Sequence, residues 1–111
     1  MSERFASYRE FWPHYLREHA KPRTRALHFV GTGAASAGLL ALLVTRRLWL
    51  LPLVLAAGYG PAWIAHFFVE KNRPATFSHP LWSLVSDYRM AFVWLTGRLN
   101  AELARARVSH R

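Results

Sequence analysis

The chain has 111 residues, of which 52% are hydrophobic, and its formal net charge is +9. This length allows a single domain, and a hydrophobic content this high, concentrated in the middle of the chain, excludes an ordinary small soluble protein. The absence of cysteine excludes disulfides, thiolate nucleophiles, iron–sulfur clusters and cysteine-based zinc sites, so that any metal must be held by imidazole and carboxylate.

An aromatic-rich amphipathic segment over residues 4–20 predicts a helix that lies at the membrane interface. Its apolar and aromatic side chains recur at helical spacing and alternate with charged ones: Phe5, Tyr8, Trp12, Tyr15, Leu16 and His19. Pro13 falls inside this pattern, so we expect a kink or a restart of the helix there. Lys21-Pro22-Arg23 then ends the segment.

Two long apolar segments follow, and they predict a transmembrane hairpin. Residues 29–45 and residues 48–69 contain no Lys, Arg, Asp or Glu, and a helix of about 20 apolar residues spans a bilayer. We therefore predict membrane helices over residues 25–45 and 48–69, with Arg46 and Arg47 at the bend between them.

The last third of the chain predicts a second amphipathic helix, over residues 80–104. Its apolar residues form one helical stripe: Leu81, Leu84, Val85, Tyr88, Phe92, Leu95 and Leu99. Asp87 and Arg89 argue against a third full span, because charged side chains are costly inside a bilayer. The expected fold class is all-α: one membrane domain over residues 1–111, with two transmembrane helices flanked by two amphipathic interfacial helices.

The positive charge is distributed unevenly along this fold. Arg46 and Arg47 occupy the bend, whereas every other Lys and Arg precedes or follows both spans. This distribution predicts an integral protein of the inner (plasma) membrane with both termini in the cytoplasm. The same cations are expected to contact anionic lipid headgroups. No nucleic-acid-binding motif is recognisable, so we expect no nucleic-acid partner.

The histidines point to a metal site. His28 lies 18 residues before Arg46 and His66 lies 19 residues after Arg47. At about 1.5 Å per residue, a hairpin brings the two to nearly the same depth. His19 lies just upstream, and Glu70 shares a helical face with His66, where it either ligates a metal or orients the imidazole. Such a set suits iron or zinc, although a histidine in this position can also simply bond a backbone carbonyl.

The remaining histidines are weaker candidates. His14 precedes His19 by five residues, about 140° around a helix, so one face cannot present both without help from a kink. His79 stands before Pro80 and indicates a capping or surface residue, and His110 lies in the C-terminal tail.

Two sequence blocks resemble a known family of small membrane proteins. The first block is Phe11-x-x-x-Tyr15-Leu16-x-x-His19 followed by Arg25-x-x-His28-x-x-Gly31-Thr32. The second and more specific block is Trp63-Ile64-Ala65-His66-Phe67-Phe68-Val69-Glu70-Lys71-Asn72-Arg73-Pro74-Ala75. The family groups short bacterial proteins with the yeast 2-hydroxy fatty acid dioxygenase of phytosphingosine breakdown, and the resemblance covers residues 5–99.

The resemblance implies an iron(II)-dependent dioxygenase that shortens 2-hydroxy fatty acids by one carbon (α-oxidation), with Fe²⁺ as cofactor and O2 as co-substrate. The metal ligands that it implies are His19, His28 and His66, and Glu70 falls on the acidic position of the family, where we expect a catalytic role. Three cations near the same membrane face are expected to bind the carboxylate or headgroup of the substrate: Arg25, Lys71 and Arg73. Ordinary anchoring of helix ends is the alternative role for these cations.

Two other functions remain open. One is a zinc-dependent lipid hydrolase that uses zinc-bound water, and the other is a non-enzymatic membrane adaptor whose histidines are structural. Because two spans enclose little volume, we also expect a homodimer that completes the substrate cavity.

Overall fold

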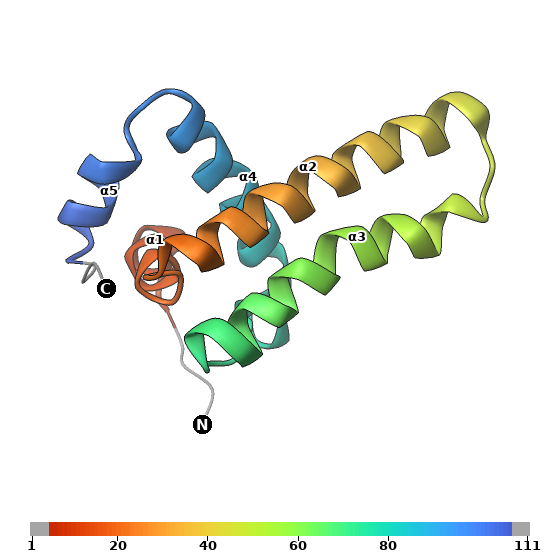
Figure 1. Ribbon diagram of the computed structural model, residues 1–111. Helices are drawn as coiled ribbons and strands as arrows, with labels where there is room; N and C mark the ends of the chain where they lie inside the picture. Colours follow the sequence, from red (N-terminus) through yellow and green to blue (C-terminus); the bar gives the residue numbers. More distant parts are fainter. Residues whose placement is uncertain (1–4, 108–111) are drawn as a thin grey trace.

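The computed structural model describes residues 5–107, apart from the side chain of Thr76, and the chain is all-helical over this range (Figure 1). The elements follow in the order α1 (Tyr8–Arg17), α2 (Pro22–Thr45), α3 (Leu50–Ile64), the π-helical segment η1 (Ala65–Glu70), the 3-10 turn η2 (Ala75–Phe77), α4 (Pro80–Leu95) and α5 (Leu99–Arg105). The predicted all-α fold class, with two helices that could cross a membrane, is therefore confirmed.

Helices α2 and α3 form a long antiparallel hairpin that projects from the rest of the molecule (Figure 1). Arg46 closes the bend in a left-handed conformation, with φ 58°. Small residues let the two backbones approach closely, because a Cβ atom added at Gly31 would lie 3.0 Å from the carbonyl oxygen of Gly58.

The surface of this hairpin is suited to lipid. The helical segments Pro22–Thr45 and Leu50–Glu70 are both long and apolar enough to cross a membrane, and only 17% and 11% of their apolar windows are buried within the protein. A soluble protein rarely exposes contiguous apolar surface on this scale. Both helices of the hairpin are therefore mostly exposed, unlike the buried core helix of a soluble protein.

The second span ends in a π-helical turn. Segment η1 continues directly from α3 and carries both His66 and Glu70. Lys71 follows in a left-handed conformation with φ 63°, and the backbone N–H of Asn72 donates to the carbonyl oxygen of His66 at 2.8 Å. The wider π turn changes the direction of the side chains at the end of the span, and such turns are frequent at functional sites.

Helix α4 turns its apolar stripe outward. Its buried residues include Ser83, Ser86 and Met90. The stripe residues are between 46% and 74% exposed: Leu81, Leu84, Val85, Tyr88, Phe92 and Leu95. The large apolar side chains of this stripe therefore stay exposed, while two serines together with Met90 and Val93 pack against the protein.

The predicted helix over residues 80–104 is in fact two helices. Helix α4 ends at Leu95, and Gly97 has a φ of +75°, a conformation that glycine adopts at little cost. The chain then reverses so that α5 packs against α1, where Trp12 Nε1 donates to Glu102 Oε1 at 2.9 Å. The hydrophobic stripe alone carried no signal for this reversal, because a single glycine is also tolerated within a helix.

The other helices also differ from their predicted bounds. Helix α1 occupies only Tyr8–Arg17 of the predicted segment 4–20, and residue 4 lies outside the described residues. Helix α2 begins at Pro22 and not at residue 25, because proline is favourable in the first helical turn. The second span begins at Leu50 and not at residue 48.

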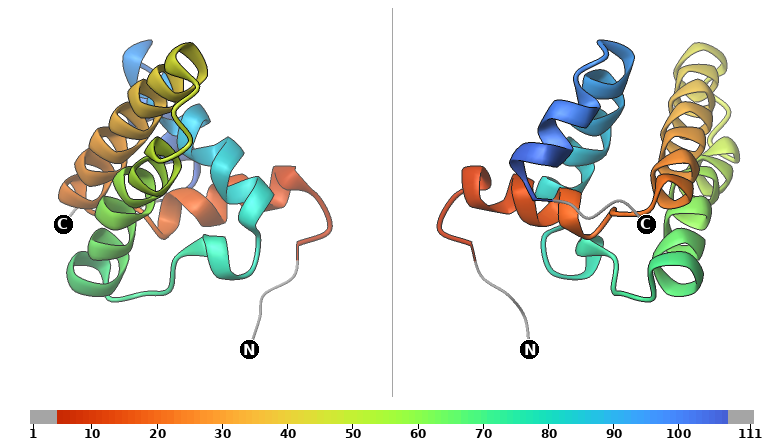
Figure 2. Two further views of the ribbon diagram at one scale, coloured as in Figure 1. Left: turned by 90° about the vertical axis from the view of Figure 1, so that its right-hand side faces the viewer. Right: turned by 60° about the vertical axis from the view of Figure 1, so that its left-hand side comes forward.

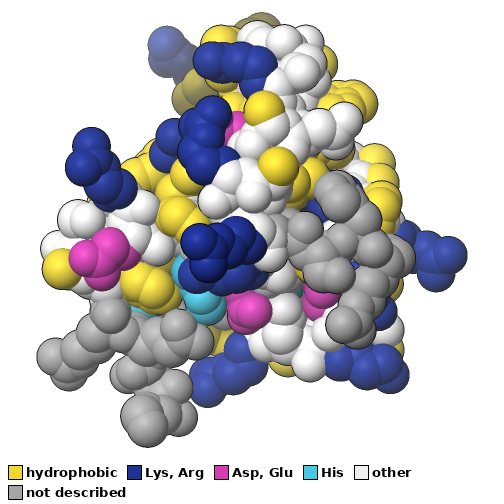
Figure 3. Space-filling model, turned by 90° about the vertical axis from the view of Figure 1, so that its left-hand side faces the viewer, with side chains coloured by type: hydrophobic (Ala, Val, Ile, Leu, Met, Phe, Trp, Pro, Cys, Tyr) yellow, Lys and Arg dark blue, Asp and Glu magenta, His cyan; other side chains and the backbone are white. Residues whose placement is uncertain are grey.

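A small hydrophobic core lies where α1, α4 and α5 meet, and it includes Phe11, Tyr15, Leu16, Met90 and Leu103. Figure 2 shows α1 near the open end of the hairpin, with α4 and α5 beside it. Lys and Arg side chains are spread over the face that contains α1 and α5 (Figure 3). We call α1 and α5, with the Lys and Arg side chains on this face, the basic helical base. The apolar hairpin projects from it.

Candidate metal centre

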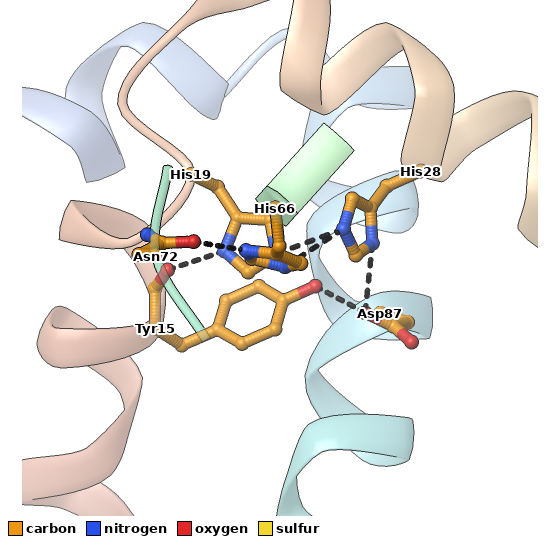
Figure 4. Close-up of polar contacts among 6 residues, drawn as sticks. All are labelled: Tyr15, His19, His28, His66, Asn72 and Asp87. Carbon is orange, nitrogen blue, oxygen red and sulfur yellow. Dashed lines mark hydrogen bonds and ion pairs between the residues drawn. The ribbon is translucent and has the colours of Figure 1, made fainter. Parts of the chain in front are cut away.

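Three histidine side chains from separate parts of the chain meet at the open end of the hairpin (Figure 4). His19 follows α1, His28 lies near the start of α2, and His66 belongs to η1. Their Nε2 atoms are mutually 3.0 to 3.1 Å apart. The three side chains are only 1%, 5% and 2% exposed, and together they form a group that could hold a metal ion.

The other ring nitrogen of each histidine faces a hydrogen-bond acceptor (Figure 4). The three Nδ1 contacts are His19 to the backbone carbonyl of Tyr15 at 2.6 Å, His66 to Oδ1 of Asn72 at 2.7 Å, and His28 to a carboxylate oxygen of Asp87 at 3.3 Å. Carbonyl and carboxylate oxygens only accept, so each Nδ1 carries the proton and each Nε2 keeps its lone pair. Metal-binding histidines are commonly oriented in this way.

Three lone pairs that converge in a buried space need a positive charge between them. The Nε2 atoms cannot hydrogen-bond to one another while all three Nδ1 atoms hold the ring protons. Burial and the neighbouring His28 and His66 also lower the pKa of His19 well below its ordinary value. This keeps His19 neutral, as a metal ligand must be. The donor set therefore fits a single metal ion.

Tyr15 and Asp87 support this cluster, and sequence reasoning missed both. The Tyr15 ring stacks on His19 with a centroid distance of 4.0 Å, and its hydroxyl donates to Asp87. Burial and the adjacent Asp87 carboxylate raise the pKa of Tyr15 well above its ordinary value, so the hydroxyl remains a donor. The spacing of four residues between Tyr15 and His19 was an available signal for the tyrosine. No spacing links Asp87 with His28, because their contact depends on how α4 packs.

Asn72 was also missed as a supporting residue. Its Oδ1 accepts from His66, while its Nδ2 donates to the Glu18 carbonyl oxygen at 3.1 Å. The second bond fixes the orientation of the amide group. Its position two residues after Glu70, inside the more specific sequence block, was the signal that could have identified it.

Glu70 lies beside the histidines and is not a member of the potential metal-binding group found among the described residues. Its carboxylate accepts a hydrogen bond from the backbone N–H of Lys21 at 2.6 Å. The Nζ atom of Lys21 also donates to the carbonyl oxygen of Val69 at 3.0 Å. These bonds tie the end of the second span to the start of the first.

The three predicted substrate-binding cations occupy different environments. Arg25 is buried, and its Nη1 donates to the carbonyl oxygens of His19 and Ala20 at 2.9 and 2.8 Å. Lys71 and Arg73 are exposed, and the Arg73 guanidinium lies 5.3 Å from the centroid of a phenylalanine ring. Arg25 thus braces the turn that carries His19, and substrate binding by the three cations stays a prediction.

The histidines judged weaker do not belong to the potential metal-binding group of the described residues. His14 packs against the ring of Phe5 at 4.8 Å, and His79 stacks on Trp82 at 5.6 Å. His110 lies outside the described residues.

Comparison with known proteins gives one match. No curated protein and no solved structure matches the chain. The sequence model of the family described as "2-hydroxy-palmitic acid dioxygenase Mpo1-like" matches residues 5–99, a range that contains the three histidines and Asp87. The chain therefore belongs to the Mpo1-like family.

Proposed function

We propose that this protein is an Fe(II)-dependent dioxygenase that removes one carbon from 2-hydroxy fatty acids at the membrane surface. The observation that carries the proposal is the buried convergence of three Nε2 lone pairs, each fixed by an acceptor on the opposite side of its ring. Membership of the family supports dioxygenase chemistry and a fatty acid substrate.

Three imidazole nitrogens suit either iron or zinc, and membership of a dioxygenase family favours iron. A ferrous ion held there would supply redox chemistry with O2 and open positions for the carboxylate and hydroxyl of a 2-hydroxy acid.

One-carbon shortening of a 2-hydroxy acid by one molecule of O2 balances without a further reactant. The products are the shortened fatty acid, carbon dioxide and water. The bond between C1 and C2 breaks, C2 becomes the new carboxyl carbon, and the substrate itself supplies the four electrons that reduce O2. The proposed reaction therefore needs no external reductant.

The residues around the centre have distinct roles in this proposal. Asp87 and Asn72 hold their imidazoles in position, and the ring of Tyr15 covers His19. Glu70 acts indirectly, because its bond to Lys21 holds the two span ends together. The cations at the same end of the hairpin attract the substrate carboxylate: Arg25, Lys71 and Arg73.

We further propose that the basic helical base faces the cytoplasm and that the protein lies in the inner membrane. The spread of Lys and Arg over the face containing α1 and α5 supports this orientation (Figure 3). The exposed stripe of α4 would then lie at the lipid boundary, where a hydroxylated fatty acid partitions through its chain. The expected homodimer stays a prediction, which cross-linking in native membranes tests.

Metal analysis and an oxygen-consumption assay test the proposal together. Protein purified without oxygen should contain about one iron per chain. With 2-hydroxypalmitate, it should consume one O2 for each shortened acid formed. His66→Ala should lose both properties, whereas the matched variant His79→Ala should retain them.

Three results would count against the proposal. Bound zinc with ester hydrolysis favours the hydrolase. Absence of metal, together with unchanged stability of His66→Ala, favours the adaptor with structural histidines. Iron without any O2 consumption would leave a metal centre but overturn the dioxygenase.

A further inference from the structure

A cleft of about 460 Å³ lies between the start of α2 and the corner at which α4 gives way to α5. This volume falls within the range of sites that bind small ligands. Its described lining comes from residues other than the three histidines of the candidate metal centre. The cleft is therefore a second place where this protein can hold a ligand.

One wall of the cleft contains a buried cation. Arg25 lines the cleft and is only 7% exposed. Its Nη1 donates to two carbonyl oxygens, and a guanidinium group has five N–H donors in all. Glu70 acts on Arg25 electrostatically, but its carboxylate accepts from the Lys21 N–H, and the ion pairs of the described residues do not include Arg25. A cation largely withdrawn from water gains from a direct ionic partner, so an anionic ligand would stabilise this arrangement.

Much of the remaining lining of the cleft is apolar. Phe29 of α2 and Trp94 of α4 stack with a centroid distance of 4.6 Å and an interplanar angle of 14°. Leu99 and the polar residue Asn100 also line the cleft. A ligand that satisfies both the cation and the apolar lining has a negative head and an apolar chain.

We propose that this cleft binds the anionic headgroup, a carboxylate or a phosphate, of a single-chain lipid. The head pairs with Arg25, and the first methylene groups lie along the Phe29–Trp94 pair. The same Arg25 braces the carbonyl oxygen of His19, so a lipid bound here sits one side chain away from the candidate metal centre. This inference rests on the proposed function in one respect, the assignment of Arg25 to a lipid carboxylate, and it needs neither the metal nor the reaction with O2.

Titration calorimetry with the full chain in neutral-detergent micelles at pH 9 tests the chemistry of the site. The probes share a twelve-carbon chain and differ in the head: dodecanoate, dodecyl phosphate, dodecanol and dodecyltrimethylammonium. At least one anion should bind with one molecule per chain and at least tenfold more tightly than the neutral or cationic probe. The preferred anion then identifies a fatty acid or a phosphate lipid as the source of the headgroup.

Two variants locate the site. Ala26→Trp fills the cleft from an exposed position and keeps Arg25, and it should weaken anion binding at least tenfold. Ala37→Trp, an exposed position on the same helix outside the lining of the cleft, is the matched control and should bind as the wild type does. Arg25→Gln should reduce binding of the anion to the level of dodecanol. Circular dichroism verifies that each variant keeps its helical content.

The inference fails if all four probes bind equally, or if Ala26→Trp binds the anion as tightly as Ala37→Trp does. His66→Ala separates this result from the proposed function. It should lose metal and oxygenase activity but keep anion binding in the cleft. In the wild type, anion binding without metal or oxygenase activity would overturn only the proposed function, and metal with activity but without anion binding would overturn only this inference.

Discussion

The hydroxyl of Tyr15 donates to the same Asp87 oxygen that faces Nδ1 of His28. One carboxylate oxygen thus connects α1, α2 and α4 at the candidate metal centre. Tyr15 also stacks on His19. It therefore contacts His19 directly and acts on His28 through Asp87. Replacing either residue should affect the metal without removing a ligand.

Asp87→Ala should lower metal affinity by about 10- to 100-fold, the usual cost of removing an outer partner of a metal-binding histidine. The His28 ring then loses the acceptor that fixes its proton on Nδ1. Competition with a chelator of known affinity measures the change. Glu10→Ala removes an acid whose carboxylate caps an exposed backbone N–H, and it should leave affinity unchanged. Equal affinities for the wild type and Asp87→Ala would contradict the role of Asp87.

Tyr15→Phe should lower metal affinity less than Asp87→Ala does. The variant keeps the ring against His19 and the backbone carbonyl that holds its Nδ1, but it loses the donor to Asp87. A hydrogen bond to a charged group contributes about 1.5 to 3 kcal/mol to stability. A double-mutant cycle on the free energy of unfolding measures this coupling, and strictly additive effects would show that the two side chains do not interact.

Removing the metal should destabilise the protein. A ligand that binds only the folded state at about 100 times its Kd adds about 2.7 kcal/mol to the free energy of unfolding. Anaerobic addition of Fe²⁺ to chelator-treated protein should raise the Tm, and His66→Ala should show no such rise. If the Tm of the wild type did not change when Fe²⁺ was added, the result would argue against a metal centre.

Glu70 variants distinguish a positioning residue from a metal ligand. Glu70→Gln keeps an amide oxygen that can accept from the Lys21 N–H, so metal affinity should change less than about threefold. Glu70→Ala loses the acceptor and should lower stability by about 1 to 2 kcal/mol. Chelator competition and thermal unfolding measure the two effects. Loss of metal from Glu70→Gln would instead make Glu70 a direct ligand.

The close approach of the two spans should not tolerate a larger residue. A methyl group at Gly31 would lie 3.0 Å from the backbone oxygen of Gly58, so Gly31→Ala should destabilise by about 1 to 3 kcal/mol. Gly33→Ala is the control on the same helix, because an added Cβ meets no atom within 4 Å there. This control should be neutral or slightly stabilising, since alanine favours helices. Unfolding in detergent compares the two, and equal stability would contradict the tight contact.

Much of the fold could be predicted because its signals are local. Uncharged runs on either side of Arg46 and Arg47 indicated the hairpin, and equal distances from the bend brought His28 and His66 to one level. The stripe of α4 was also visible in the sequence. Its outward orientation was not, because the same stripe can face either a core or lipid.

The features of the structure that could not be predicted from the sequence depend on contacts between segments that are distant in the chain. Asp87 supports His28 only because α4 packs across the open end of the hairpin, and no period in the sequence encodes that packing. The reversal of the chain at Gly97 likewise depends on the packing of α5 against α1. For Glu70, the helical spacing correctly placed it near His66, but its hydrogen bond to Lys21 arises from the meeting of the two spans.

The supports of the three histidines differ in how far apart they lie along the chain. His66 is held twice by Asn72, once through its ring and once through its backbone carbonyl, and both bonds fall within one short stretch of chain. His19 is held by Tyr15, one helical turn earlier. The support of His28, in contrast, comes from Asp87 of α4, far along the chain. Two imidazoles thus have a partner in their own stretch of chain, and a change that displaces α4 should reach the metal centre first through the third, His28.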